Sequence, residues 1–245
     1  MDLKIIGSAS SGNGYILDNG NEALMIECGM AWKSVQKCVD FNVSRIQGSI
    51  ISHEHGDHAK HAEKAQKSCV PVYASHGTIE RIGLSGFNVH EMVAFQKYVI
   101  GNFTVMPFDV QHDAAEPFGF LIHHPETGLV LFATDTYYLK YTFPGLNNIM
   151  LECNYRQDIL DANVINGVVN PAQRNRTMQS HMSLDTCIET LMANNLDDVN
   201  NIVLIHLSNT NSDAQYFKQM VTRATGRNVE IAAPGLVIPF NKHEF

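Results

Sequence analysis

The chain has 245 residues, 44% of them hydrophobic, and its 17 Lys and Arg against 25 Asp and Glu give a formal net charge of −8. This length and composition fit one globular domain over residues 1–245 and exclude a disordered tail protein, while the negative charge disfavours binding to nucleic acid over a broad surface. No apolar run approaches the ~18 residues of a membrane span and the first residues lack a secretory signal pattern, so we expect a cytosolic protein without membrane contact.

Short β-branched and aliphatic runs separated by turn residues predict a first half made mostly of strands. The predicted strands cover residues 3–6, 15–17, 24–26, 49–51, 70–73, 103–108, 118–122 and 129–133. Helical periodicity predicts helices over residues 32–39, 58–67, 184–193 and 214–224. Ser183 and Asp213 stand directly before the last two helices as N-caps, and the apolar run 202–205 predicts a strand between them.

The order of these elements favours a single layered α/β sandwich. The chain contains no Pro/Gly/Ser linker, low-complexity tract or fixed repeat that would divide it, and many short strands bracketed by helices indicate sheets covered by helices. Its five cysteines are scattered and form no Cys-x-x-Cys pair. We therefore expect reduced, mostly buried thiols rather than disulfides or a thiolate metal site.

Histidine is the most informative residue type, because three of the 12 histidines follow one apolar run in the pattern H-x-H-x-D-H. His53 and His55 are two residues apart, so on extended backbone they project to the same side and can hold one ion, while Asp57 and His58 can face a second. Imidazole and carboxylate suit zinc or manganese, and iron also fits. The alternative is a solvated histidine-rich loop in which Gly56 simply makes the turn.

A two-metal site also needs ligands from other parts of the chain, and these should stand at strand ends. His112, Asp135 and His206 each follow an apolar run. With this set, the chain resembles the metallo-β-lactamase-fold hydrolases, whose four-layer αββα sandwich of two mixed sheets flanked by helices carries two metals at the sheet edge. The resemblance implies a first metal held by His53, His55 and His112, a second held by Asp57, His58 and His206, and Asp135 bridging both. Of the other histidines, His61 and His76 are expected to be structural, and the surface or loop residues are expected to be His90, His123, His124 and His243.

Three further signatures resemble the YycJ/WalJ-type branch, which is similar to RNase Z and is associated with phosphodiester cleavage, notably exonuclease action on DNA. They are residues 7–13 after the first strand, residues 180–183 before a helix and residues 206–209 after the last core strand. The first is expected to be a loop that can present backbone N–H groups to a phosphate, although such a run is also typical of a simple turn. The candidate substrate contacts here are Ser10, Ser11, Asn13 and Ser208.

The resemblance makes Asp57 and His181 the candidate catalytic residues. His181 matches the additional histidine of RNase Z-like enzymes, where an imidazolium can protonate a leaving oxygen; the alternative is a structural histidine bonded to backbone. Arg174 and Arg176, expected in the loop before it, can give a phosphate bidentate contacts. One departure is Glu27, which stands where the family usually has aspartate and either orients a ligand through a hydrogen bond or loses that contact.

Three function classes follow, all with two divalent metal ions. The first is a nuclease acting on nucleic acid ends through a metal-bridging hydroxide, which the signatures favour and the net charge disfavours. The second is a phosphodiesterase for small cyclic nucleotides, as in the phage anti-Pycsar enzymes of the same superfamily. The third is a lactonase, thioesterase or β-lactamase, which has no evident use for His181 and the arginines. The non-enzyme alternative is a catalytically silent binding module, which would not need the full ligand set. The resemblance also suggests a homodimer.

Overall fold

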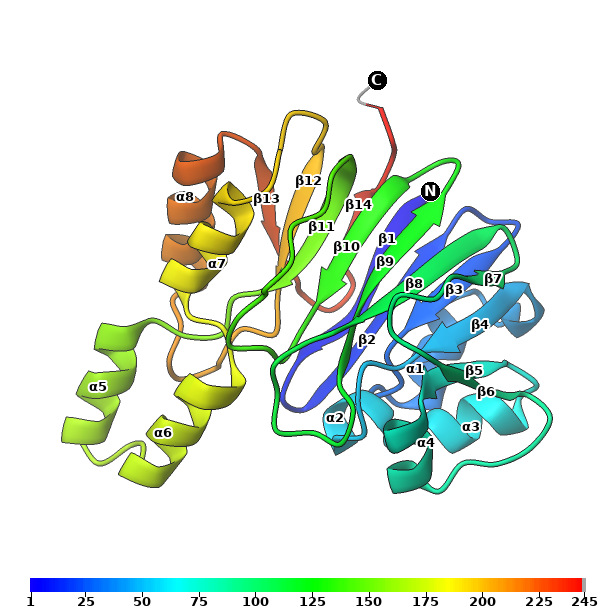
Figure 1. Cartoon of the computed structure of the whole chain (residues 1–245), viewed down its shortest axis with the longest axis horizontal. Coiled ribbons are helices and arrows are strands. Elements are labelled where there is room, and N and C mark those ends of the chain that lie inside the picture. The colour runs from blue at the N-terminus through cyan, green and yellow to red at the C-terminus, as the bar shows by residue number, and fades with distance from the viewer. Residues whose placement is uncertain (244–245) are drawn as a thin grey trace.

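The computed structural model describes residues 1–243, and two seven-stranded mixed sheets packed face to face form its centre (Figure 1). The first sheet contains, in spatial order, β14 (Val237–Pro239), β1 (Asp2–Ala9), β2 (Gly12–Asp18), β3 (Ala23–Ile26), β4 (Ile46–Ile50), β5 (Val72–Ser75) and β6 (Val89–Met92). The second contains β13 (Asn228–Ile231), β12 (Asn201–Ile205), β11 (Leu146–Glu152), β10 (Gly128–Ala133), β9 (Phe118–His124), β8 (Phe103–Asp109) and β7 (Tyr98–Ile100).

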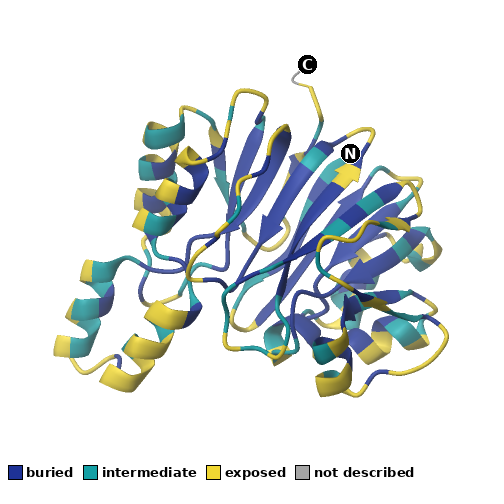
Figure 2. Cartoon of the chain, viewed as in Figure 1, coloured by how far each residue is buried: buried dark blue, intermediate teal, exposed yellow. Residues whose placement is uncertain are grey.

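Both sheets change from antiparallel to parallel pairing partway across. Strands β3 to β6 pair parallel in the first sheet, and strands β10 to β13 pair parallel in the second. Parallel strands are buried on both faces, and β11 and β12 accordingly have every residue buried (Figure 2). The carboxyl ends of parallel neighbours meet at one edge of a sheet, so side chains that follow these strands lie together there.

Helices cover the two outer faces, which confirms the predicted four-layer αββα sandwich. Against the first sheet lie α1 (Trp32–Cys38), α2 (Gly56–Ala59), α3 (Ala62–Lys67) and α4 (His76–Ile82), with a short 3-10 turn at Val43–Arg45. Against the second lie α7 (Leu184–Met192) and α8 (Ala214–Thr225), capped as predicted: Ser183 accepts a hydrogen bond from Thr186 N and Asp213 from Tyr216 N. A third apolar cluster fills the space between the sheets.

Helices α5 (Gln157–Ile165) and α6 (Pro171–Ser180) form an arm that projects from the sandwich (Figure 1). The sequence patterns do not predict this arm, and the expectation that Arg174 and Arg176 lie in a loop is wrong. Both arginines lie in α6, which begins with Pro171 at its first position and with the Asn170 side chain accepting a bond from Gln173 N. The helix has a single buried residue, Ser180, so it offers no apolar stripe to a periodicity search.

The Gly/Ser/Asn segment 7–13 is also not the loop we predicted. It is the end of a β-hairpin in which β1 pairs with β2 and only Ser10 and Ser11 lie between the strands. Its glycines make room for Met30: a Cβ on Gly7 or Gly12 would come within 2.4 or 2.8 Å of the Met30 sulfur. Close packing, rather than an anion-binding loop, explains these glycines.

Smaller differences concern one helix and two histidines. The predicted helix 58–67 is two helices, because the chain turns at His61, whose N–H donates to Cys28 O at 2.9 Å instead of continuing the helix. His124 is buried beneath Glu22 with Nε2 3.2 Å from Oε1, so it is not a surface residue. His90 is half-buried in β6 and stacks on Tyr73, so it is not a loop residue. The five cysteines are free, and three of them are fully buried, as predicted.

The sequence analysis missed several further elements, namely β6, β7, β11, β13, β14 and α4. Within residues 1–243, no helix is both long and apolar enough to cross a membrane. The cytosolic location stays a prediction.

Candidate active site

Ligand-type side chains from both sheets meet at one edge of the sandwich, where strands β4, β8, β10, β11 and β12 end. The segment after β4 brings the H-x-H-x-D-H motif, with α2 beginning at Gly56 inside it. The ends of the other strands bring His112, Asp135, Glu152 and His206. Residues separated by more than 150 positions in the sequence therefore share one site.

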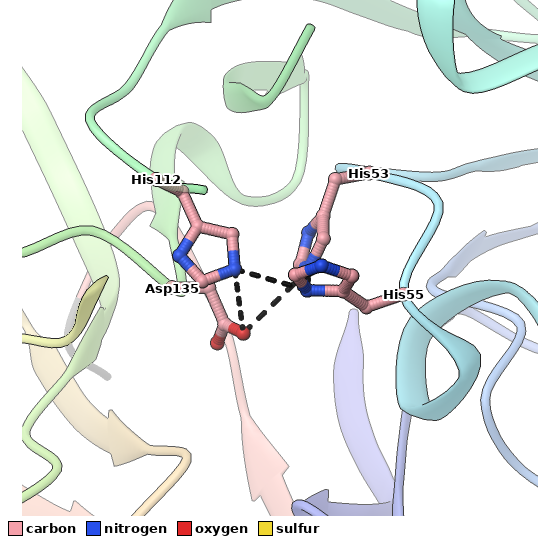
Figure 3. A group of neighbouring side chains, drawn as sticks. All are labelled: His53, His55, His112 and Asp135. Carbon is pink, nitrogen blue, oxygen red and sulfur yellow. Dashed lines mark hydrogen bonds and ion pairs between the residues drawn. The ribbon is translucent and has the colours of Figure 1, made fainter. Parts of the chain in front are cut away.

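The first group joins three histidines and one aspartate, all pointing at a common position (Figure 3). Nδ1 of His55 lies 3.1 Å from Nε2 of His53 and 3.1 Å from Nε2 of His112. The Oδ2 atom of Asp135 is 3.6 Å from both of those Nε2 atoms.

The second group shares Asp135 with the first. Nε2 of His58 lies 3.3 Å from Asp135 Oδ2 and 3.2 Å from Asp57 Oδ2. Nε2 of His206 lies 3.5 Å from the same Asp57 oxygen. Asp135 Oδ2 is thus common to both groups.

These spacings fit two metal ions. Four ligand atoms that lie ~2.0–2.2 Å from one tetrahedrally bound ion are about 3.3–3.6 Å from each other, close to the observed separations. His206 Nε2 is buried without a hydrogen-bond partner, as a nitrogen reserved for a metal would be. The donors are imidazoles and carboxylates only, which suits zinc, manganese or iron.

A surrounding set of polar groups fixes the ligands. His53 Nδ1 lies 2.9 Å from Ser52 Oγ, and His112 Nδ1 donates to the Ser180 carbonyl at 3.0 Å, which leaves Nε2 of each ring for the shared position. Glu27 is fully buried and lies at the ligand His58: its Oε1 is 3.5 Å from His58 Nδ1, an ion-pair distance, without the hydrogen bond that was one of the two expected outcomes. Asn13 Nδ2 contacts His58 Nε2 at 3.1 Å and Asp57 Oδ2 at 3.2 Å.

The backbone at the site is strained at three residues. Glu27, Asp135 and His206 have φ angles of 66°, 47° and 54°, in the left-handed region that residues other than glycine rarely adopt. Each stands at the carboxyl end of a strand, where the left-handed turn directs its side chain into the site. Such conformations cost about 1–3 kcal/mol each and cluster at functional sites.

Glu152 is the main residue that the sequence analysis missed. It ends β11, is fully buried, and its Oε1 accepts from His181 Nδ1 at 2.8 Å and lies 3.1 Å from His206 Nδ1. Its Oε2 accepts from the backbone N–H groups of Thr136 at 2.9 Å and Met182 at 3.2 Å. The sequence did contain a signal for Glu152, because it is an acidic residue directly after the apolar run 149–151. A carboxylate buried at the end of such a strand needs hydrogen-bond or charge partners.

The charges at the site follow from these contacts. Burial opposes ionisation of Asp135, but the neighbouring His206 and His58 rings hold the pKa of its carboxyl well below the usual range. Burial likewise opposes protonation of His181, but the Glu152 carboxylate outweighs it and raises the pKa of His181. The site therefore combines ionised carboxylates with three imidazoles, those of His58, His181 and His206, whose pKa the neighbouring carboxylates raise against the effect of burial.

A cavity of about 600 Å³ opens onto these residues. Ser10, Ser208, His181 and, from α6, Arg176 line it. Three other predicted substrate contacts do not line the cavity: Ser11 stands on the hairpin turn, Asn13 supports the ligands, and Arg174 is paired with Asp161 at 2.6 Å.

Comparison with known proteins gives a consistent picture. The family model described as "Beta-lactamase superfamily domain" matches residues 26–207. The chain is 29% identical to exodeoxyribonuclease YycJ of Bacillus anthracis over 178 residues, which are 65% of this chain and 65% of that protein, so the match spans slightly less than two thirds of the relative. It is 24% identical to exodeoxyribonuclease WalJ of Streptococcus pneumoniae over 224 residues, covering 85% of this chain and 82% of that one.

Solved structures share the fold at lower identity. The metallo-beta-lactamase fold protein YhfI from Bacillus subtilis aligns with a TM-score of 0.76 at 17% identity, covering 97% of this chain and 98% of that chain. The short form of human tRNase Z aligns with a TM-score of 0.67 at 14% identity over 97% and 98%. A diphosphatase of the PhnP family aligns with a TM-score of 0.69 at 14% identity over 97% and 96%.

Proposed function

Because the chain belongs to the beta-lactamase superfamily, we propose that it is a metal-dependent hydrolase that cleaves phosphodiester bonds at the ends of nucleic acid strands. The observation that carries the proposal is the shared position of Asp135 Oδ2 between two ligand groups, with the Glu152–His181 pair beside them. The names of the curated relatives YycJ and WalJ, both exodeoxyribonucleases, support the choice of substrate.

In this proposal, His53, His55 and His112 hold one divalent cation, Asp57, His58 and His206 hold a second, and Asp135 contacts both. When bound, two such cations would activate water for attack and offset the negative charge of the phosphate. Zinc, manganese and iron all match the donors. Asn13 contacts the Asp57 carboxylate and keeps it directed at the second group. The proposed catalytic role of Asp57 is therefore that of a metal ligand.

His181 acts as the proton donor to the departing oxygen. The Glu152 carboxylate accepts from its Nδ1 at 2.8 Å, so the ring is fixed and Nε2 is the nitrogen left for the substrate. Burial opposes protonation of the His181 ring, but the Glu152 carboxylate raises the pKa of His181, which favours the protonated form that donates. Arg176, Ser10 and Ser208, which line the same cavity, are the proposed contacts to phosphate oxygens.

The test is hydrolysis in the presence of manganese or zinc of end-labelled single- and double-stranded DNA, RNA and cyclic nucleotides, with nitrocefin as a control for lactamase activity. We expect progressive shortening of DNA by the wild type and by His123→Ala, and none by His55→Ala. His123 is a suitable matched control because it is exposed on β9. If cyclic nucleotides are hydrolysed while DNA and RNA are not, the result would instead favour the small-substrate phosphodiesterase. Activity on nitrocefin alone would refute the proposal.

Partners follow from the same proposal. A nucleic acid end or a nucleotide is the expected partner, and the homodimer stays a prediction that the molecular mass in solution decides.

A further inference from the structure

A second cavity, of about 630 Å³, adjoins the cavity at the proposed metal centre. The two cavities share two lining residues, His112 and Arg176. Its walls come from the segment after β8, the segment after Asp135, and helix α6. The volume lies within the ~300–1,000 Å³ range of sites for small molecules. The cavity is therefore large enough for one nucleotide unit placed directly beside the reacting phosphate.

The chemistry of its walls suits a nucleobase. Tyr137 contributes an aromatic ring, and Gln111, Asn175 and Gln179 contribute amide groups that can both donate and accept. Aromatic rings stack with the faces of bases, and amides pair with the donor and acceptor atoms on base edges. An apolar ligand would leave these amides unpaired.

The backbone of Tyr137 is held in place before any ligand arrives. Tyr137 follows Asp135 by two residues, and its N–H donates to the Gln111 carbonyl at 3.3 Å. Thr136, between Asp135 and Tyr137, is fixed by two hydrogen bonds of its hydroxyl group. Its Oγ1 accepts from Gln111 N at 3.0 Å and donates to the Tyr138 carbonyl at 2.8 Å. The ring itself is 42% exposed. A ring on a rigid backbone loses little entropy when a base stacks on it.

Arg176 stands at the boundary of the two cavities. Its Nε donates to Asp113 Oδ2 at 3.0 Å, and the other Asp113 oxygen accepts from Ser180 Oγ at 3.0 Å. The guanidinium is thus oriented through one edge, while its terminal N–H groups are left for an anion. A phosphate between the metal centre and the second cavity would meet these groups.

We propose that the second cavity binds a single unpaired base of the substrate, stacked on Tyr137, next to the phosphate that is cleaved. This inference rests on the proposed function and narrows its substrate to nucleic acid whose terminal base has left the duplex. The amides on its walls can pair with a base only where the edge of that base is free of a partner strand, so a paired end must fray before it enters.

The test measures binding, separately from hydrolysis. Isothermal titration of the manganese-loaded protein compares 2′-deoxyadenosine 5′-monophosphate with 2-deoxyribose 5-phosphate, which lacks the base. We expect the nucleotide to bind the wild type roughly 5- to 150-fold more tightly, the range for one base stacked on an aromatic side chain. In Tyr137→Ala this preference should be lost, and in Tyr137→Phe it should remain.

Tyr138→Ala is the matched control. Tyr138 is the neighbouring tyrosine, is 52% exposed, and borders a separate cavity with Lys140 and Glu189. This variant should keep the full preference for the nucleotide. Equal affinities of the wild type for both ligands, or a preference that survives in Tyr137→Ala, would overturn the inference.

Failure of the proposed function looks different. If the wild type prefers the nucleotide through Tyr137 but hydrolyses neither DNA nor RNA, the base subsite stands and the nuclease proposal falls. The opposite outcome has two parts: the wild type shortens DNA, and Tyr137→Ala shortens it as fast as the wild type does, both with a normal and with an abasic terminal nucleotide. In that case the nuclease proposal stands and the subsite falls.

Discussion

Replacing Glu152 with glutamine tests whether one carboxylate organises the site. Its two oxygens accept from four donors: the ring nitrogens of His181 and His206 on one side and the backbone N–H groups of Thr136 and Met182 on the other. An amide keeps one oxygen, so its NH2 group must face one of these donor pairs. His206 Nδ1 also lies 2.8 Å from Asp135 Oδ1 and keeps that acceptor, so one or two buried donors lose theirs at ~1–3 kcal/mol each. We expect Glu152→Gln to lower the free energy of unfolding by about 1–6 kcal/mol.

The measurement is thermal and urea unfolding followed by circular dichroism, with manganese and after chelation. For a chain of this length, the expected loss lowers Tm by about 2 °C or more. Glu189→Gln is the control, because Glu189 is exposed on α7 and its substitution should stay within ~0.5 kcal/mol of the wild type. A Glu152→Gln protein that unfolds with the same Tm as Glu189→Gln would refute the role of the carboxylate as acceptor for all four donors.

Three further predictions concern the ligands, the proton donor and the core. Asp135→Ala should abolish metal-dependent hydrolysis and reduce bound metal, measured by elemental analysis, while the circular dichroism spectrum stays native; activity in a metal-verified variant would contradict the two-metal site. His181→Ala should keep both ions and slow turnover most for substrates with poor leaving groups, so an equal loss on activated nitrophenyl esters would count against proton donation. Phe217→Ala, at a fully buried position of α8, should lower the free energy of unfolding by about 3–5 kcal/mol in urea, and a loss under 1 kcal/mol would show that the position repacks.

The residues of the site that could be predicted from the sequence are those that follow the ends of strands. The H-x-H-x-D-H motif, His112, Asp135 and His206 all follow apolar runs, and parallel strands deliver their carboxyl ends to one edge. The sandwich was predictable for a related reason, since alternating apolar runs and capped helices indicate layers. The metal-binding roles of these residues stay proposals, although the structure brings them together.

Residues that support the site were harder to find, because their partners are distant in sequence. Glu152 ends a strand that begins Leu146-Asn147-Asn148, whose two asparagines concealed the apolar pattern; Asn148 is buried and donates to carbonyls of Thr127 and Asn241. The arm formed by α5 and α6 was missed for a different reason. Each of its helices buries a single residue, so no periodic stripe marks them.

The left-handed residues of the site set a limit on how this chain can be stabilised. At positions 27, 135 and 206, glycine or asparagine would adopt the same backbone with less strain, so a screen for heat resistance alone is expected to enrich those substitutions. Replacing Asp135 or His206 would remove a group that faces the proposed ions, and replacing Glu27 would remove the carboxylate that lies 3.5 Å behind the ligand His58. Thermostability engineering of this protein should therefore hold Glu27, Asp135 and His206 fixed and look for improvements elsewhere, because at these three positions resistance to heat and chemistry select for opposite residues.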